Sequence, residues 1–123
     1  MEKVERLAGS QVALDHLRVC PVQEAPQNCG RCEKCMRTMT MLRLCGALER
    51  SGTFPRTVRA TDLARVRLPT RHSVVFARQI IRRAREVGDW PVYAAVSWTL
   101  HTRAKVHGLV PPKVRRALGL ASR

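Results

Sequence analysis

Residues 20–35 read CPVQEAPQNCGRCEKC, and this stretch decides how the fold of the chain is interpreted. It contains four of the five cysteines, in the spacing Cys20-x8-Cys29-x2-Cys32-x2-Cys35. Four thiolates suit a tetrahedral zinc ion, and an all-cysteine ligand set leaves no open coordination position for chemistry. The spacing therefore predicts one structural Zn²⁺ bound by these four cysteines.

The residues between the cysteines favour a metal site. Gly30 allows the backbone to turn tightly. Cys32 and Cys35 are three residues apart at the expected start of a helix, and therefore lie on one face of it. The positive end of the helix dipole, with Arg31 and Lys34 nearby, favours the thiolate form that a metal requires.

An iron–sulfur cluster is a second interpretation of the same cysteines. The last three have the first three intervals of a bacterial ferredoxin run, and Cys20 is followed by a proline, as the remote ferredoxin ligand is. The charged residues between the ligands weigh against it, because they leave no apolar shell in the sequence. Zinc is preferred, and iron–sulfur stays open.

The composition indicates one small globular domain. The chain has 123 residues and an apolar fraction of 45%, which is ordinary for a folded protein. It has no apolar run of membrane-spanning length and no hydrophobic signal region in MEKVERLAGS. We therefore expect a soluble, cytoplasmic protein without a membrane partner. Clustered cysteines in that reducing compartment favour metal binding over disulfides.

The apolar periodicity predicts helices, with only a weak strand signal at residues 16–20. The expected helices are 2–8, 11–17, 33–48, 61–66, 71–87, 90–106 and a short one after Pro112. Ser10, Thr61 and Asp89 are the expected N-caps, and Gly88 is the expected stop of the fifth helix. The predicted fold class is all-α: a small helical domain stapled by a four-cysteine zinc site.

Two of these helices have well-defined predicted faces. In helix 33–48 the apolar face comprises Met36, Met39, Met41, Leu42, Leu44, Cys45 and Leu48, and the polar side is lined by Arg37, Thr40, Arg43 and Arg50. In helix 71–87 the apolar stripe comprises Val74, Ala77, Ile80, Ile81, Ala84 and Val87, and the outer residues are Arg78, Arg82, Arg83 and Arg85. The fifth cysteine, Cys45, is thus expected in the core.

The charge divides the chain unevenly. Residues 1–50 carry 8 basic and 6 acidic side chains, whereas residues 51–123 carry 15 and 3, which together give the net charge of +14. We expect a zinc-binding helical module at 1–50, a linker with a short helix at 51–70 and a basic helical segment at 71–123. The basic segment predicts a nucleic-acid partner through phosphate neutralisation, or an acidic surface on a protein partner.

The run NCGRCEKC, residues 28–35, with Cys20 upstream, resembles the zinc motif near the C-terminus of 7-cyano-7-deazaguanine synthases. These belong to the PP-loop family of ATP pyrophosphatases, in which an adenylating Rossmann-like domain precedes a small helical zinc lobe. The run LRVCPVQEAPQNCGRCEKCMRTMTMLRLCGAL is also similar to a set of longer bacterial proteins. The resemblance covers about residues 2–55. It implies zinc at the four cysteines, and it matches Arg37 and Thr38 to positions that recur in the family.

The chain departs from that family in one large respect. The ATP-binding signature Ser-Gly-Gly-x-Asp-Ser is absent from the sequence, as is any other glycine-rich phosphate loop. The resemblance thus implies the C-terminal lobe alone, as a truncated gene product or a separately encoded subunit. Its expected partner is a nucleotide-binding catalytic domain encoded elsewhere.

The sequence does not indicate an independent enzyme. None of its nine carboxylates is paired in a setting that suggests acid–base work, and no Ser–His–Asp or Cys–His order stands out. Two main functional classes stay open. The first is a zinc-binding docking module that is not catalytic alone, and the second is a small zinc-containing protein that binds nucleic acid through residues 71–123.

Overall fold

The computed structural model describes residues 1–21 and 27–109, and for residues 103–109 the helical backbone alone. Within these ranges the fold is all-α, as predicted, and contains no strand. The helices are α1 (Glu2–Ala8), α2 (Gln11–His16), α3 (Glu33–Leu44), the single 3₁₀ turn η1 (Leu48–Arg50), α4 (Ala60–Leu63), α5 (Arg71–Val87) and α6 (Trp90–Leu109). None of them combines the length and the apolar character that crossing a membrane requires. The helix expected after Pro112 lies outside the described residues.

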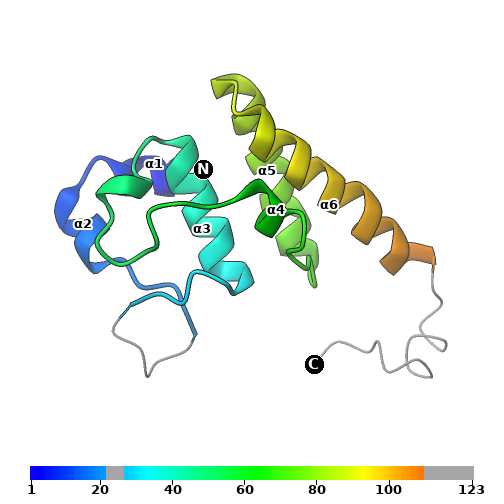
Figure 1. The fold of residues 1–123 in the computed structure, drawn as a ribbon, viewed down its shortest axis with the longest axis horizontal. Helices are drawn as coiled ribbons and strands as arrows, with labels where there is room; N and C mark the ends of the chain where they lie inside the picture. Colours follow the sequence, from blue (N-terminus) through cyan, green and yellow to red (C-terminus); the bar gives the residue numbers. More distant parts are fainter. Residues whose placement is uncertain (22–26, 110–123) are drawn as a thin grey trace.

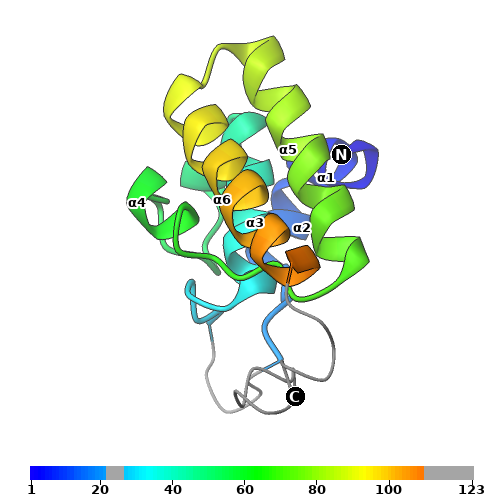
Figure 2. The same cartoon turned by 90° about the vertical axis from the view of Figure 1, so that its right-hand side faces the viewer.

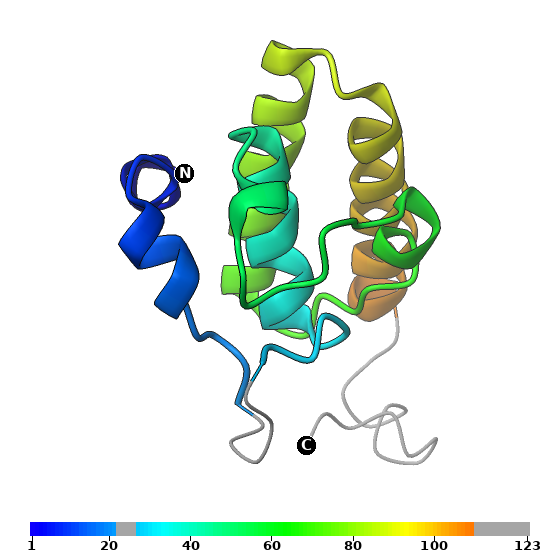
Figure 3. The same cartoon turned by 60° about the vertical axis from the view of Figure 1, so that its left-hand side comes forward.

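Helix α3 occupies the centre of the molecule. The two short N-terminal helices lie on one side of it, and the long α5 and α6 lie on the other (Figures 1 and 3). Helix α3 contacts both α1 and α5, while α4 packs against α6. The single core of buried apolar side chains therefore runs from the N-terminal helices through α3 to α6.

The N-terminal helices form as predicted and are held to the rest of the chain by polar contacts. The hydroxyl oxygen of Ser10 accepts a hydrogen bond from the Ala13 N–H at 3.3 Å, which makes Ser10 the N-cap of α2. Further along, the Arg50 guanidinium donates to the Ala8 carbonyl at 2.6 Å, and the Gln11 amide donates to the Arg50 carbonyl at 2.9 Å. These bonds fix α1 and α2 against η1.

The third helix is shorter than predicted, because it ends at Leu44 rather than near residue 48. Gly46 has a φ of 66°, its N–H donates to the Arg43 carbonyl at 2.9 Å, and the Ala47 N–H donates to the Leu42 carbonyl at 2.8 Å. This pair of bonds is a Schellman motif, which terminates a helix at a left-handed glycine. Gly46 is therefore the residue in the sequence that indicates where α3 ends.

Thr40 corrects the predicted polar side of the same helix. It was expected beside Arg37 and Arg43, but it is fully buried. Its hydroxyl donates to the Met36 carbonyl at 2.7 Å, so the buried polar group is satisfied within the helix. Because α3 is covered from two sides, its buried arc is wider than that of a helix lying on a surface.

Helices α5 and α6 are the two long helices that the sequence predicted, and they form an antiparallel hairpin joined at Gly88 and Asp89. Gly88 ends α5 with a φ of 76°, and the Asp89 carboxylate accepts from the Val92 N–H at 3.3 Å as the N-cap of α6. Several details differ from the prediction. Val87 is exposed at the end of α5 instead of buried, and α6 continues to Leu109 instead of ending near residue 106. Helix α4 spans Ala60–Leu63 instead of 61–66, so Thr61 lies inside it and is not its cap.

One ion pair joins α3 to this hairpin. The Arg43 guanidinium donates to both carboxylate oxygens of Asp89, at 2.7 and 3.1 Å, and its third nitrogen donates to the Val58 carbonyl at 2.9 Å. Since Asp89 also caps α6, a single carboxylate orients two helices. The contact brings together residues from all three predicted segments of the chain.

We expect the substitution Asp89→Ala to lower the free energy of unfolding by about 1–2 kcal/mol, because it removes both the bidentate pair and the cap of α6. Urea denaturation followed by circular dichroism measures this change. Glu86→Ala is the matched control, since the Glu86 carboxylate pairs with Arg82 and Arg83 near the surface. Equal losses of stability in the two variants would contradict the role given to Asp89.

Candidate metal centre

The four cysteines predicted as ligands lie together in the structure. The sulfur atoms of Cys20, Cys29, Cys32 and Cys35 are all within 4.8 Å of one another, and those of Cys29 and Cys35 are 3.8 Å apart. Tetrahedral Zn–S bonds of about 2.3 Å place sulfurs about 3.8 Å apart. The cluster therefore has the size of a site for one metal ion. None of the five cysteines forms a disulfide.

The turn from Cys29 to Cys32 is shaped by backbone hydrogen bonds to sulfur. The Cys29 sulfur accepts from the Arg31 N–H at 3.5 Å and from the Cys32 N–H at 3.3 Å. This turn needs a φ of 67° at Gly30, and a β-carbon there would lie 2.6 Å from the Pro55 ring. Gly30 is thus required both by the backbone conformation and by the close approach of residue 55.

Helix α3 begins inside the cluster. Cys32 is its N-cap, with a sulfur that accepts from the Cys35 N–H at 3.4 Å in the place of the usual cap oxygen. Cys35 lies in the first turn and is the buried member of the four. The positive end of the helix dipole therefore faces the sulfurs and favours negative charge on them.

The local surroundings give three of the four clustered cysteines different pKa values. The N–H groups of Arg31 and then Cys32 lower the pKa of Cys29 to about 6, so this thiol is ionised at neutral pH. Burial raises the pKa of Cys32 and, more strongly, that of Cys35. A metal that binds all four sulfurs must displace protons from the latter pair, and its affinity should fall as the pH is lowered.

A residue that sequence reasoning missed holds Cys20 beside the other ligands. Asn28 is 5% exposed, and its side-chain oxygen accepts from the Val19 and Cys20 N–H groups at 2.9 and 3.1 Å. Its side-chain nitrogen donates to the carbonyls of Leu17, at 2.8 Å, and Thr53, at 3.2 Å. The weak strand signal at 16–20 was wrong, because residues 17–20 are an irregular segment that bonds to this amide.

Further hydroxyl contacts fasten the same region. The Thr53 hydroxyl donates to the Leu17 carbonyl at 2.8 Å, and the Ser51 hydroxyl donates to the Leu14 carbonyl at 3.2 Å. The Asn28 N–H donates to the Thr53 carbonyl at 3.0 Å. The segment after η1 is therefore a bridge between the Cys20 and Cys29 sides of the cluster.

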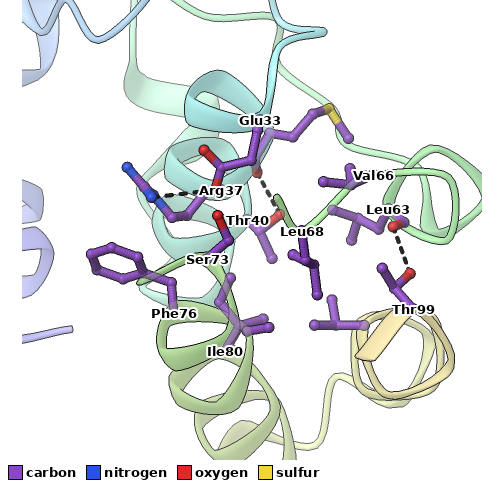
Figure 4. Close-up of a pocket in the computed structure, with 13 residues that line it drawn as sticks. Glu33, Arg37, Thr40, Leu63, Val66, Leu68, Ser73, Phe76, Ile80 and Thr99 are labelled. Carbon is purple, nitrogen blue, oxygen red and sulfur yellow. Dashed lines mark hydrogen bonds and ion pairs between the residues drawn. The ribbon is translucent and has the colours of Figure 1, made fainter. Parts of the chain in front are cut away.

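Arg37 is one of the two positions, with Thr38, that the family resemblance singles out. It lies at the edge of a small cavity between α3, α5 and α6. Its guanidinium donates to the Glu33 carboxylate at 3.2 Å and lies 4.1 Å from the centre of the Phe76 ring (Figure 4). The second position, Thr38, is buried. Arg37 thus joins the start of α3 to α5.

The cavity has a volume of about 30 Å³ and a mainly apolar lining. The hydroxyls of Thr40 and Thr99 that reach it are bonded to the Met36 and Leu63 carbonyls (Figure 4). This is room for about one water molecule, so the cavity is too small for a substrate. Cys45 lies outside the sulfur cluster, and burial raises the pKa of its thiol.

Comparison of the chain with protein-family models, with curated proteins and with solved structures finds no match. The resemblance over residues 2–55 therefore depends on its motifs alone.

We expect Asn28→Ala to lower the free energy of unfolding by about 2–4 kcal/mol, because it removes four side-chain hydrogen bonds and takes the acceptor from the part-buried N–H groups of Val19 and Cys20. It should also weaken metal binding, since the Cys20 segment loses its attachment. Chemical denaturation and competition with a chromogenic chelator measure the two effects. Gln27→Ala, at the exposed neighbouring position, is the control. If both variants behave like the wild type, Asn28 does not organise the cluster.

Proposed function

We propose that this chain is a helical module cross-linked by one structural Zn²⁺, and that it docks on a nucleotide-binding catalytic domain encoded elsewhere. The observation that carries the metal half of the proposal is the convergence of four cysteine sulfurs within 4.8 Å. All four positions of a tetrahedral ion would be filled by protein, so the ion would have no site for a substrate or a reactive water.

The spacing of the sulfurs supports a single ion over an iron–sulfur cluster. Sulfurs that all lie within 4.8 Å of one another leave room for one ion at their centre, whereas several irons and sulfides need ligands further apart. Zinc is the usual ion in four-cysteine structural sites, and it is redox-inert, as a purely structural role requires.

The expected contribution of the ion is to the fold. It connects Cys20, on the irregular segment after α2, to Cys29 in the following loop and to Cys35 in α3. Structural zinc sites are worth on the order of 10 kcal/mol at neutral pH, which exceeds the net stability of most small domains. The N-terminal helices offer little core of their own, so their attachment to α3 would depend on the ion.

The docking half of the proposal draws on the resemblance to the C-terminal lobe of 7-cyano-7-deazaguanine synthase-like proteins. The sequence has the lobe's cysteine motif and no Ser-Gly-Gly-x-Asp-Ser signature. In the described part of the chain, the apolar cavity beside Arg37 has the volume of about one water, and a larger hollow of about 340 Å³ beside Arg43 and Arg56 is lined by a single carboxylate, that of Glu49. Catalysis would thus belong to the partner.

The metal half predicts that purified protein holds one zinc per chain and is colourless. Cys32→Ser should release the metal and unfold residues 10–50, because it removes a ligand; the serine hydroxyl can still cap α3, so the loss of structure would come from the metal. Cys45→Ser, outside the cluster, should keep the full zinc content at a modest cost in stability. Elemental analysis, visible absorbance and circular dichroism are the measurements.

Three results would count against a structural zinc. A brown preparation with iron and labile sulfide would establish the iron–sulfur interpretation. Full helicity after chelation of the wild type would remove the structural role. Loss of zinc on changing Cys45 would show that the ligand set is wrong.

The docking half predicts a complex with the product of an adjacent gene that encodes the Ser-Gly-Gly-x-Asp-Ser domain. Co-expression followed by size-exclusion chromatography should give a 1:1 complex that is lost on chelation of the metal. If such a domain is encoded nearby and the two proteins elute separately, docking is wrong, although the metal content of the chain alone still tests the structural zinc.

A further inference from the structure

The solvent face of α5 is a row of arginines. Arg71, Arg78, Arg82 and Arg85 are all exposed, and their spacing of seven, four and three residues places them on one side of the helix. We call these four residues the arginine ridge. The opposite side carries the buried residues Ser73, Ala77, Ile80 and Ala84.

Arg83, which the sequence placed with the outer arginines, does not belong to the ridge. It lies toward α1, where its guanidinium is 3.8 Å from the Glu5 carboxylate, and it also pairs with Glu86 at 3.3 Å. Its side chain is 33% exposed. Arg83 is therefore part of the packing between helices.

The ridge has little acidic counter-charge. Arg82 pairs with Glu86 at 3.1 Å, whereas Arg71, Arg78 and Arg85 form no ion pair with any residue that the structure describes. Guanidinium groups that are not held by carboxylates present planar donors matched to phosphate oxygens. The ridge is thus suited to a partner with several phosphates.

Two exposed indoles lie on the neighbouring helix. Trp90 and Trp98 are 59% and 64% exposed, and they lie on the solvent side of α6, away from the buried Val92 and Val96. Trp90 follows the Gly88–Asp89 turn directly, and therefore lies at the same end of the hairpin as Arg85. Its ring meets the Tyr93 ring edge-on, with centroids 5.7 Å apart.

The hairpin places the helix that carries the arginine ridge beside the helix that carries the two exposed tryptophans. Helices α5 and α6 pack side by side along their length, and both come forward in Figure 2. A partner that used the charge alone would leave two indoles in water. A partner that used the indoles alone would leave three guanidinium groups unpaired.

We propose that the outer face of the α5–α6 hairpin binds single-stranded nucleic acid. The arginine ridge contacts phosphates, and Trp90 and Trp98 stack on unpaired bases. Each nucleotide of a single strand offers both a phosphate and an open base face, whereas the bases of a duplex are already stacked. This activity goes beyond the proposed docking role and does not depend on it.

The test uses the full, metal-loaded chain and a fluorescent single-stranded oligonucleotide of mixed sequence, with the same oligonucleotide annealed to its complement for comparison. Anisotropy titrations should show tighter binding of the single strand. The logarithm of the affinity should fall linearly with the logarithm of the salt concentration, with a slope of about −2 to −3 for three or four phosphate contacts.

Two paired sets of variants separate charge from stacking. Arg78→Glu with Arg85→Glu should lower the affinity about tenfold or more and flatten the salt slope. Arg56→Glu with Arg59→Glu makes the same change of net charge at exposed positions outside α5, α6 and the arginine ridge, and should have a much smaller effect. Trp90→Ala with Trp98→Ala should lower the affinity about tenfold and leave the slope unchanged. Val12→Ala, an exposed apolar position on α2, is the control for the aromatic pair.

Circular dichroism of every variant checks that the helices are intact. The proposal is overturned if the wild type does not bind at low salt, or if both arginine pairs reduce binding equally. It is also overturned if duplex and single strand bind alike without dependence on the tryptophans. Polyglutamate that binds as tightly as the oligonucleotide, with the same dependence on Arg78 and Arg85, would assign the face to an acidic protein instead.

Discussion

Four cysteine sulfurs within 4.8 Å of one another constrain the chain from Cys20 to the first turn of α3. Ionised sulfurs at this separation repel, and ordering the loops that carry them costs conformational entropy. The chain offsets part of both costs without an ion. Backbone N–H groups point at the Cys29 and Cys32 sulfurs, and Gly30 permits the turn that aims them. The Asn28 amide, bonded on both of its polar atoms, brings in Cys20. The bound ion would act on a site whose backbone is already arranged.

Helix α3 connects this cluster to the other half of the molecule. Its first residues belong to the sulfur site, and its last turn carries Arg43, which binds the Asp89 carboxylate at the hairpin turn. The helix has twelve residues and is about 18 Å long. Arg37 adds a second link near the start of the helix through the Phe76 ring. A rigid element of this length makes the N-terminal helices and the α5–α6 hairpin parts of one core, although their net charges differ greatly.

The features that were predictable from the sequence are those with a local signal. The cysteine spacing, the Ser10 cap and the Gly88 stop each act on backbone groups a few residues away, so their neighbours in the sequence are sufficient to find them. Thr40 and Arg83 were misplaced because their environment is set by helices distant in the chain, namely α5 and α1. Asn28 was missed for the same reason, since its partners at Leu17 and Thr53 lie on opposite sides of it in the sequence. Gly46 was different, because its signal was local and was overlooked within an apolar pattern that continued to Leu48.

The scarcity of carboxylates explains why the outer arginines of α5 have little acidic counter-charge. The chain has only nine, and most of those with described partners hold arginines at packed positions. Glu5 and Glu86 fix Arg83 between α1 and α5, Glu33 fixes Arg37 over a ring, and Asp89 fixes Arg43 beneath the hairpin turn. Those pairs neutralise the arginines that must lie inside or between helices. Among the arginines of α5, Arg71, Arg78 and Arg85 are left without such a partner on its outer side, where water solvates them in the free protein and where an anionic partner can reach them.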